Sequence, residues 1–307
     1  MQALAVILEA PERLSLRALT LNALQPADVL VEVEWSGVSS GTEKLLWTGR
    51  MPAFPGMGYP LVPGYESVGR IVDAGAEVTA RVGEWVFVPG ANCYQDAKGL
   101  FGGTARRVVL PSARAIPAPE TLGRDGILLA LAATAYHAVA KGAPDLVMGH
   151  GILGRLIARV AIAAGHRAPT MWEPNEARRS GVGYCVIAPE TDERRDYARI
   201  CDASGASDVL DLAIPRLAKG GEVVLAGFYD RLAFGFPPAF MREASIRIAA
   251  EFSPADLTAV TALIRAGALR LDGLISHVRD AAEAPDAYPA AFTDPECLKM
   301  VLDWRQM

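Results

Sequence analysis

The chain has 307 residues, 51% of them hydrophobic and 21% charged, a composition that fits a globular protein of about two domains and excludes a disordered one. The formal net charge of −5 and the lack of any Lys/Arg block argue against a nucleic-acid partner. The apolar runs are too short to span a bilayer, and the first residues lack the basic start of a signal peptide, so we expect a cytoplasmic protein. The four cysteines show no CxxC pairing, so we expect reduced thiols.

The first part of the chain predicts β-structure with irregular loops. Runs rich in Val and Ile are bounded there by Gly, Pro, Asp or Asn, which is typical of strands. They lie at residues 2–8, 28–38, 68–75, 84–89 and 104–111. The stretch 45–64, LLWTGRMPAFPGMGYPLVPG, has neither a helical nor a strand period. It is either a loop packed on its own domain or a surface that faces a ligand.

From about residue 121 the pattern changes. A helical run at 126–142 is followed by strand-length apolar runs that alternate with helical ones, as in βαβ units with a parallel sheet. These runs lie at 145–149, 153–166, 168–173, 184–189, 198–203, 209–221 and 222–228. The tail from 258 to 304 predicts two amphipathic helices around one further strand. The expected fold class is therefore α/β, with a β-rich domain at 1–120, completed by 275–307, and a doubly wound parallel-sheet domain at 121–274.

A glycine-rich turn marks the start of the second predicted domain. DLVMGHGILGRL contains G-x-G-x-x-G after a predicted strand and at the start of a predicted helix, the context in which this pattern binds a dinucleotide pyrophosphate. Glu173 ends the next strand, where a carboxylate accepts hydrogen bonds from both adenosine ribose hydroxyls and repels a 2′-phosphate, so we expect NAD rather than NADP. The predicted cofactor-binding residues are Gly149, His150, Gly151, Ile152, Leu153, Gly154 and Glu173.

With these motifs the chain resembles the medium-chain, zinc-type alcohol dehydrogenases over nearly its whole length, with a GroES-like start and a Rossmann centre. Members of that superfamily carry a C-G-T-D-like stretch, then G-H-E, then a third cysteine before the cofactor domain. Here SSGTE has Ser40 in place of the first cysteine, in a register known to within one residue, and GYE has Tyr65 in place of the histidine, with Glu66 kept. ALAA stands where the third cysteine is expected.

The resemblance therefore implies a member without zinc. A serine, a tyrosine and one carboxylate are poor zinc ligands, and the lobe that holds a structural zinc in relatives is replaced by residues 90–103 with the single Cys93. Without a metal, alcohol oxidation needs a protein group to take the hydroxyl proton. Tyr65 is expected to be a neutral phenol unless a cation such as Lys44 lowers its pKa. The candidate catalytic residues are Ser40, Thr42, Tyr65 and Glu66.

Residues 35–72 and 88–103 carry a closer resemblance, to the hydroxyethyl bacteriochlorophyllide dehydrogenases of phototrophic bacteria. It implies NAD-dependent oxidation of a 1-hydroxyethyl group on the macrocycle to acetyl, a step of bacteriochlorophyll a biosynthesis, together with loose association with the photosynthetic membrane. The superfamily implies a homodimer. Aromatic faces and thioethers suit a flat conjugated ring. The candidate substrate residues are Trp47, Met51, Phe54, Met57 and Tyr59.

Two other functions stay open at this point. One is a zinc-independent NAD(P)H enone or quinone reductase of the same superfamily, against which Glu173 argues because these enzymes usually use NADPH. The other is a non-catalytic nucleotide-binding protein, against which the intact glycine pattern argues.

Overall fold

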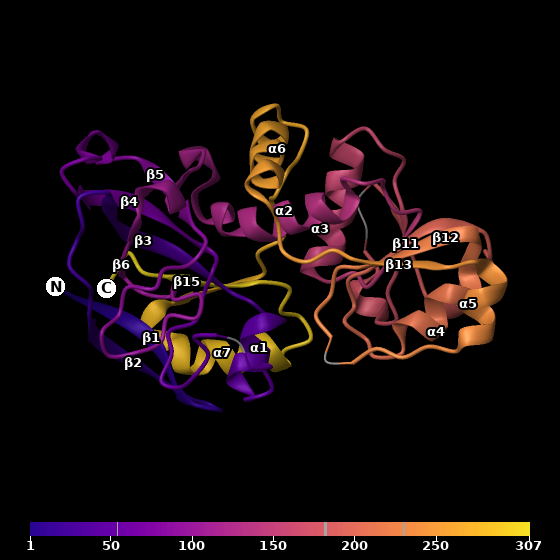
Figure 1. Ribbon diagram of the computed structural model, residues 1–307, viewed down its shortest axis with the longest axis horizontal. Coiled ribbons are helices and arrows are strands. Elements are labelled where there is room, and N and C mark those ends of the chain that lie inside the picture. Colours follow the sequence, from indigo (N-terminus) through magenta and orange to yellow (C-terminus); the bar gives the residue numbers. More distant parts are fainter. Residues whose placement is uncertain (54, 181–182, 230) are drawn as a thin grey trace. The chain divides into compact units, whose positions relative to one another are not determined.

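The computed structural model describes residues 1–53, 55–180, 183–229 and 231–307. It divides into two compact units, a first unit made of Met1–Ala130 with Leu271–Met307, and a second unit made of Leu131–Arg270. Figure 1 colours the chain along the sequence, and its indigo start and yellow end both belong to the first unit. The second unit is thus inserted between two separated parts of the first.

The first unit is built mainly from antiparallel strands. Within β3, Val29, Val31 and Val33 are buried while Glu32 and Glu34 are half-buried, the alternation of a strand with one face on a core. Strands β1 and β2 form a hairpin, and the larger sheet has the order β14-β15-β3-β4-β5-β7, with β6 also paired to β3. The strands are β1 (Gln2–Ala10), β2 (Arg13–Thr20), β3 (Asp28–Val38), β4 (Ser67–Ala74), β5 (Trp85–Val88), β6 (Arg107–Pro111), β7 (Ile116–Pro117), β14 (His277–Asp280) and β15 (Met300–Asp303).

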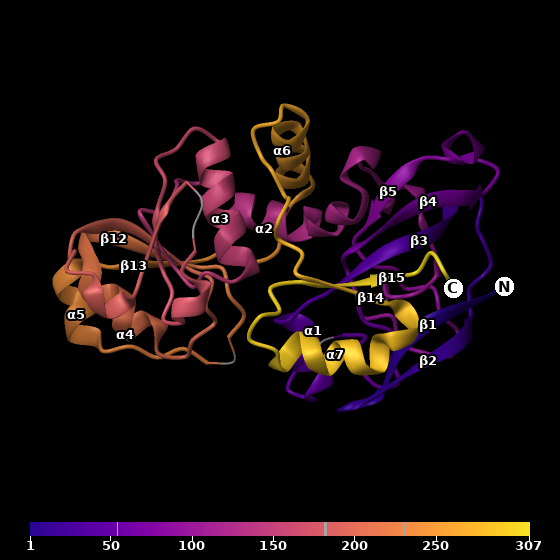
Figure 2. The same ribbon diagram turned by 180° about the vertical axis from the view of Figure 1, so that it is seen from behind.

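Two helices of the first unit come from opposite ends of the sequence. Helix α1 covers Thr42–Trp47 and helix α7 covers Ala284–Thr293. They lie side by side in both Figure 1 and Figure 2, and the ring of Trp47 is 6.4 Å from that of Phe292. A capping box of Asp280 and Glu283 satisfies N–H groups of the short 3-10 turn Ala281–Glu283, which leads into α7. The tail of the chain is thereby packed against residues that precede Tyr65.

The second unit is a parallel sheet with helices. Its strand order is β10-β9-β8-β11-β12-β13, every neighbouring pair is parallel, and the order reverses between β8 and β11, as in a doubly wound dinucleotide-binding sheet. The strands are β8 (Leu146–Met148), β9 (Thr170–Trp172), β10 (Cys185–Ile187), β11 (Tyr197–Asp202), β12 (Leu217–Leu225) and β13 (Ser245–Ile248). The helices are α2 (Leu129–Val139), which begins in the first unit, α3 (Ile152–Ala163), α4 (Val209–Ala213), α5 (Phe236–Arg242) and α6 (Pro254–Arg265).

The predicted α/β class, with a β-rich part and a doubly wound parallel sheet, is confirmed. Strands overlap all five runs predicted before residue 112. Five elements were not predicted, namely β2, α1, β7, α5 and β13, and the tail contains a strand, β15, beyond the single strand expected there. In the described part of the chain, no helix is long and apolar enough to cross a membrane.

Candidate active site

The glycine pattern forms the turn between β8 and α3. Gly149 has a φ of +97°, a conformation that favours glycine, and a Cβ at Gly154 would lie 1.9 Å from the carbonyl oxygen of Gly149. Gly151 precedes the helix, and a Cβ there would meet no protein atom within 4 Å, so the N-terminus of α3 is open at this point. Ile152 and Leu153 form the first turn, whose N–H groups have no partner within the helix. This turn fits the phosphates of a dinucleotide.

Glu173 lies immediately after β9, next to this turn. Its side chain is only 6% exposed, and its two carboxylate oxygens accept hydrogen bonds from the N–H groups of His150, at 3.3 Å, and Asn175, at 2.8 Å. The Arg179 guanidinium donates to the backbone carbonyl of Glu173 instead of to its carboxylate. The carboxylate therefore stays free of an ion pair with Arg179.

His150 is buried within the glycine turn. Its Nδ1 lies 2.6 Å from the carbonyl oxygen of Arg178 and its Nε2 lies 3.0 Å from the hydroxyl of Tyr184. Burial lowers the pKa of the imidazole, which favours its neutral form. Its side chain therefore ties the turn to the segment that follows β9.

Tyr65 lies at the end of the segment that leads into β4. Its hydroxyl donates a hydrogen bond to the Oγ of Ser39 at 2.9 Å. Thr42, the first residue of α1, is half-buried. Burial raises the pKa of Tyr65 well above its ordinary value, with a further rise from Glu66, so the phenol is neutral. Lys44 is exposed and donates to the carbonyl of Phe292, so it does not turn Tyr65 into a phenolate.

The serine brought to Tyr65 is Ser39 and not Ser40. Ser39 is 6% exposed, whereas Ser40 is exposed to solvent. Ser39 directly follows strand β3, whereas Ser40 lies in the turn before α1.

Glu66 is fully buried beside Tyr65. The ammonium of Lys299, which is 2% exposed, donates a hydrogen bond to its Oε2. Its Oε1 is buried and has no hydrogen-bond partner among the described residues. Burial raises the pKa of Glu66, and Lys299 opposes that rise. A carboxylate held in this way by a buried cation is not disposed to bind a metal ion.

Glu43, in α1, is the second fully buried carboxyl among the described residues of the first unit. Its Oε2 accepts a hydrogen bond from the hydroxyl of Tyr288 in α7 at 2.7 Å, and its Oε1 accepts one from the N–H of Ser39 at 3.3 Å. Burial raises the pKa of Glu43 to about 8, aided by Glu66 and opposed by the Tyr288 hydrogen bond. At neutral pH this group is therefore mostly uncharged, and it connects α7 to the residue that bonds Tyr65.

The residues around Tyr65 do not fit a zinc ion. Zinc prefers thiolate and imidazole ligands, and Ser39 and Tyr65 supply only neutral hydroxyls while Glu66 is bound by Lys299. Among the residues that the structure describes, His, Cys, Asp and Glu do not gather in any group of three or more that could hold a metal.

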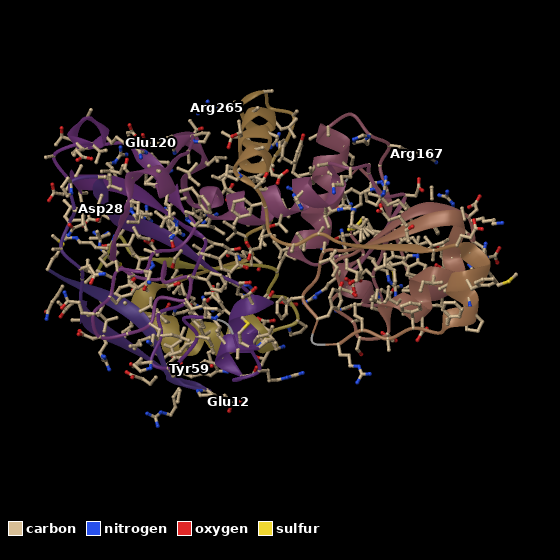
Figure 3. All side chains as sticks on the ribbon, viewed as in Figure 1. Glu12, Asp28, Tyr59, Glu120, Arg167 and Arg265 are labelled. Carbon is tan, nitrogen blue, oxygen red and sulfur yellow. The ribbon has the colours of Figure 1, made fainter. Side chains whose placement is uncertain are left out.

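The Met- and aromatic-rich loop packs around a small apolar cluster of Leu8, Leu46, Met51 and Leu61. Met51 is 8% exposed and belongs to the cluster itself. Half-buried side chains pack against the cluster, and Tyr59 among them, labelled in Figure 3, donates to the carbonyl of Leu46. Phe54 lies outside the described residues. We call the following half-buried side chains the apolar rim: Trp47, Met57, Tyr59, Leu100 and Phe101.

Three residues of this site, Glu43, Tyr288 and Lys299, were not among the predicted site residues, and Ser39 lies one residue from the predicted Ser40. Tyr288 and Lys299 come from places that no local motif connects to Tyr65. The one available signal was Lys299 itself, a charge directly before the buried apolar strand β15, which needs a buried partner. His137, in α2, lies 2.9 Å from Asp256 within the second unit.

Comparison with known proteins identifies the family. Residues 25–120 match the alcohol dehydrogenase GroES-like domain. The chain is 54% identical to the 2-desacetyl-2-hydroxyethyl bacteriochlorophyllide A dehydrogenase of Rhodobacter capsulatus and 55% identical to that of Cereibacter sphaeroides, with 99% of each chain covered in both cases. The chain belongs to this family of dehydrogenases. It is thereby a member of the zinc-type alcohol dehydrogenase superfamily, as the motifs had indicated.

Solved structures agree with this assignment at the level of the fold. An alcohol dehydrogenase of Escherichia coli CFT073 complexed with NADH has a TM-score of 0.84 at 22% identity, covering 98% of this chain and 99% of the other. Alcohol dehydrogenase from Thermus sp. ATN1 has a TM-score of 0.83 at 24% identity, covering 99% of both. The family's fold is thus shared with dehydrogenases whose sequences differ widely.

Proposed function

We propose that this protein oxidises the 1-hydroxyethyl side chain of a bacteriochlorophyllide to acetyl, with NAD as hydride acceptor, in bacteriochlorophyll a biosynthesis. The observation that carries the proposal is the identity of 54% and 55%, over 99% of the chain, with two bacteriochlorophyllide dehydrogenases. The first unit would bind and position the substrate, and the second would bind the nucleotide. A cytoplasmic location, loosely associated with the photosynthetic membrane, is part of the proposal because the pigment is apolar.

NAD is proposed rather than NADP because of Glu173. Its carboxylate lies beside the glycine turn, and the nearby Arg179 is engaged by backbone carbonyls at 2.8 and 2.6 Å. A negative charge here accepts hydrogen bonds from ribose hydroxyls and repels a 2′-phosphate. When bound, NAD supplies the nicotinamide that accepts hydride from the carbinol carbon.

Loss of that hydride must be accompanied by loss of the hydroxyl proton. Tyr65 is a neutral phenol that already donates to Ser39, so it can accept a hydrogen bond from the substrate hydroxyl. As the substrate proton moves to Tyr65, the phenol proton would move to Ser39 and the Ser39 proton to a solvent water, which is the final acceptor. Thr42, a half-buried hydroxyl at the start of α1, can serve as a second path for the proton. Glu66 is not proposed as the acceptor, because Lys299 holds its charge.

We propose that this proton transfer works without zinc. Two observations support this: Ser39, Tyr65 and Glu66 are poor zinc ligands, and the structure of the substrate itself favours loss of hydride. The reacting carbon is attached directly to a conjugated macrocycle, which delocalises the positive charge that develops as hydride leaves. Elemental analysis of the purified protein should find well under one zinc per chain, with activity unaffected by chelators; stoichiometric zinc tied to activity would contradict this part of the proposal.

We also propose a homodimer joined at the edge of the second unit's sheet. Strand β13 lies last in the sheet order, and its Ile248 is 73% exposed. In α5, just before it, Phe236, Phe240 and Met241 are 69%, 68% and 71% exposed. An edge strand with large exposed apolar side chains favours pairing with a second chain. Ile248→Lys should shift the molecular mass measured by light scattering from dimer to monomer; a wild-type monomer would refute the proposal.

The direct test is incubation of the purified protein with the hydroxyethyl pigment and NAD, followed by the absorbance change as the acetyl group joins the conjugated system. Acetyl product formed with equimolar NADH supports the proposal. Oxidation of NADH or NADPH by simple quinones, without pigment oxidation, would indicate a reductase instead. A thermal shift with NAD but no turnover of either kind would indicate a non-catalytic binding protein.

A further inference from the structure

Phe101 has a backbone conformation that is rare for a bulky residue. Its φ is +69°, in the left-handed region, which aromatic side chains avoid because their Cβ crowds the backbone. Residues in such conformations persist only where the surrounding structure holds them, and they cluster at functional sites. The role of Phe101 can be inferred from the backbone contacts that hold it and from the residue that its ring contacts.

Backbone contacts on both sides hold this segment in place. The carbonyl oxygen of Phe101 accepts a hydrogen bond from the N–H of Ala91 at 2.6 Å, and Gly102 donates to the carbonyl of Val62 at 3.0 Å. A Cβ at Gly90 would lie 2.2 Å from the carbonyl oxygen of Phe101, so only glycine permits that approach. Residues 90–103 are thus held by close backbone packing, which fixes the direction of the Phe101 side chain.

The ring of Phe101 lies against the side chain at the centre of the candidate site. Its centroid is 5.1 Å from that of Tyr65, and the two planes are inclined at 59°. Phe101 is also half-buried and belongs to the apolar rim, with Trp47 and Met57. It is therefore a member of the rim whose ring adjoins the ring of Tyr65, the residue proposed to handle the proton.

We propose that Phe101 determines specificity for a flat conjugated ring, its side chain forming the wall on which the macrocycle lies while the hydroxyethyl group reaches Tyr65. This inference rests on the proposed function. A flat π system gains from an aromatic wall and a small aliphatic alcohol gains little. Phe101 should therefore act on binding of the pigment and not on the nucleotide.

The test compares variants at position 101. Phe101→Gly removes the ring and suits the left-handed backbone, and Phe101→Tyr keeps the ring. We expect the glycine variant to raise KM for the pigment about ten-fold with KM for NAD unchanged, and the tyrosine variant to retain the wild-type KM. Glu243→Gly is the matched control, because Glu243 also has a positive φ, of 48°, and an exposed side chain in the second unit.

If the glycine variant does not fold, Phe101→Leu keeps an apolar side chain without a flat ring and gives the same comparison. A wild-type KM for the pigment in the folded variants that lack the ring would overturn the role of Phe101. An equal rise in KM for the pigment in Glu243→Gly would also overturn it, because the rise would then come from placing glycine at a position of positive φ and not from loss of the ring. Absence of turnover by the wild-type protein would instead count against the proposed function.

Discussion

Replacing Glu43 with glutamine should change how the stability of the first unit depends on pH. Glu43 is fully buried, and burial raises its pKa from the ordinary 4.5 to about 8. Between those values the folded protein keeps a proton that the unfolded chain releases. The stabilising contribution of the protonated carboxyl is thus complete below about pH 4.5 and is lost as pH rises toward 8.

The size of this effect follows from the two pKa values. Each pH unit between them corresponds to about 1.4 kcal/mol, so the wild-type free energy of unfolding should fall by roughly 4–5 kcal/mol across the interval. The amide introduced by Glu43→Gln has no proton to lose, and it can accept from Ser39 and donate to Tyr288 in the geometry of the native carboxyl. The variant should therefore gain stability relative to wild type as pH rises from 5 to 8.

Urea unfolding at a series of pH values, followed by tryptophan fluorescence, measures this difference. Four of the five tryptophans belong to the first unit, so the signal reports mainly on it. Glu77→Gln, at an exposed position of the same unit, is the control for loss of a carboxylate. Parallel pH profiles for Glu43→Gln and wild type would refute the reasoning, because they would mean that Glu43 is ionised in both states.

Three further predictions concern the site. Lys299→Met should destabilise the first unit by about 3–5 kcal/mol in urea unfolding, because it leaves the buried Glu66 unpaired, and a small loss would mean that the pair is open to water. Tyr65→Phe should lower kcat about 10²–10⁴-fold with little change in NAD affinity, and full turnover would exclude Tyr65 from proton transfer. Glu173→Ser should lower the ratio of kcat/KM with NAD to kcat/KM with NADP. Equal use of both nucleotides by the wild-type protein would show that the Glu173 carboxylate does not select the cofactor.

The elements that the sequence predicts well are those with a strong local period. The valines of β3 alternate along one strand, and the glycines before α3 combine with a strand and a helix that are each clear by themselves. The missed strand β13 has only four residues, SIRI, and pairs with β12 on one side alone. Such a short edge strand carries too few positions for its period to be visible, and its existence depends on the neighbouring strand.

The residues of the candidate site likewise divide into those that a local motif predicts and those that only the fold brings together. Tyr65 and Glu66 could be found because they occupy one short motif, whereas the partner of Glu66 is 233 residues away along the chain. No local pattern contains such a pairing, since it is created when β15 joins the sheet beside β3. The choice between Ser39 and Ser40 likewise depends on where β3 ends, and element boundaries are the least certain part of a sequence prediction.

The return of the chain to the first unit has a consequence for biosynthesis. Every strand of the second unit has left the ribosome before Tyr288 and Lys299 are made, so that unit can fold while the first is still incomplete. Until those two residues arrive, Glu43 and Glu66 lack their buried partners and the edge of β3 that receives β15 is open. Joining the tail to the first unit after the second has folded is a long-range step, so it is slow and leaves apolar surface exposed in the meantime. Nascent chains of this protein should therefore depend on chaperones most strongly in the interval just before the tail is released.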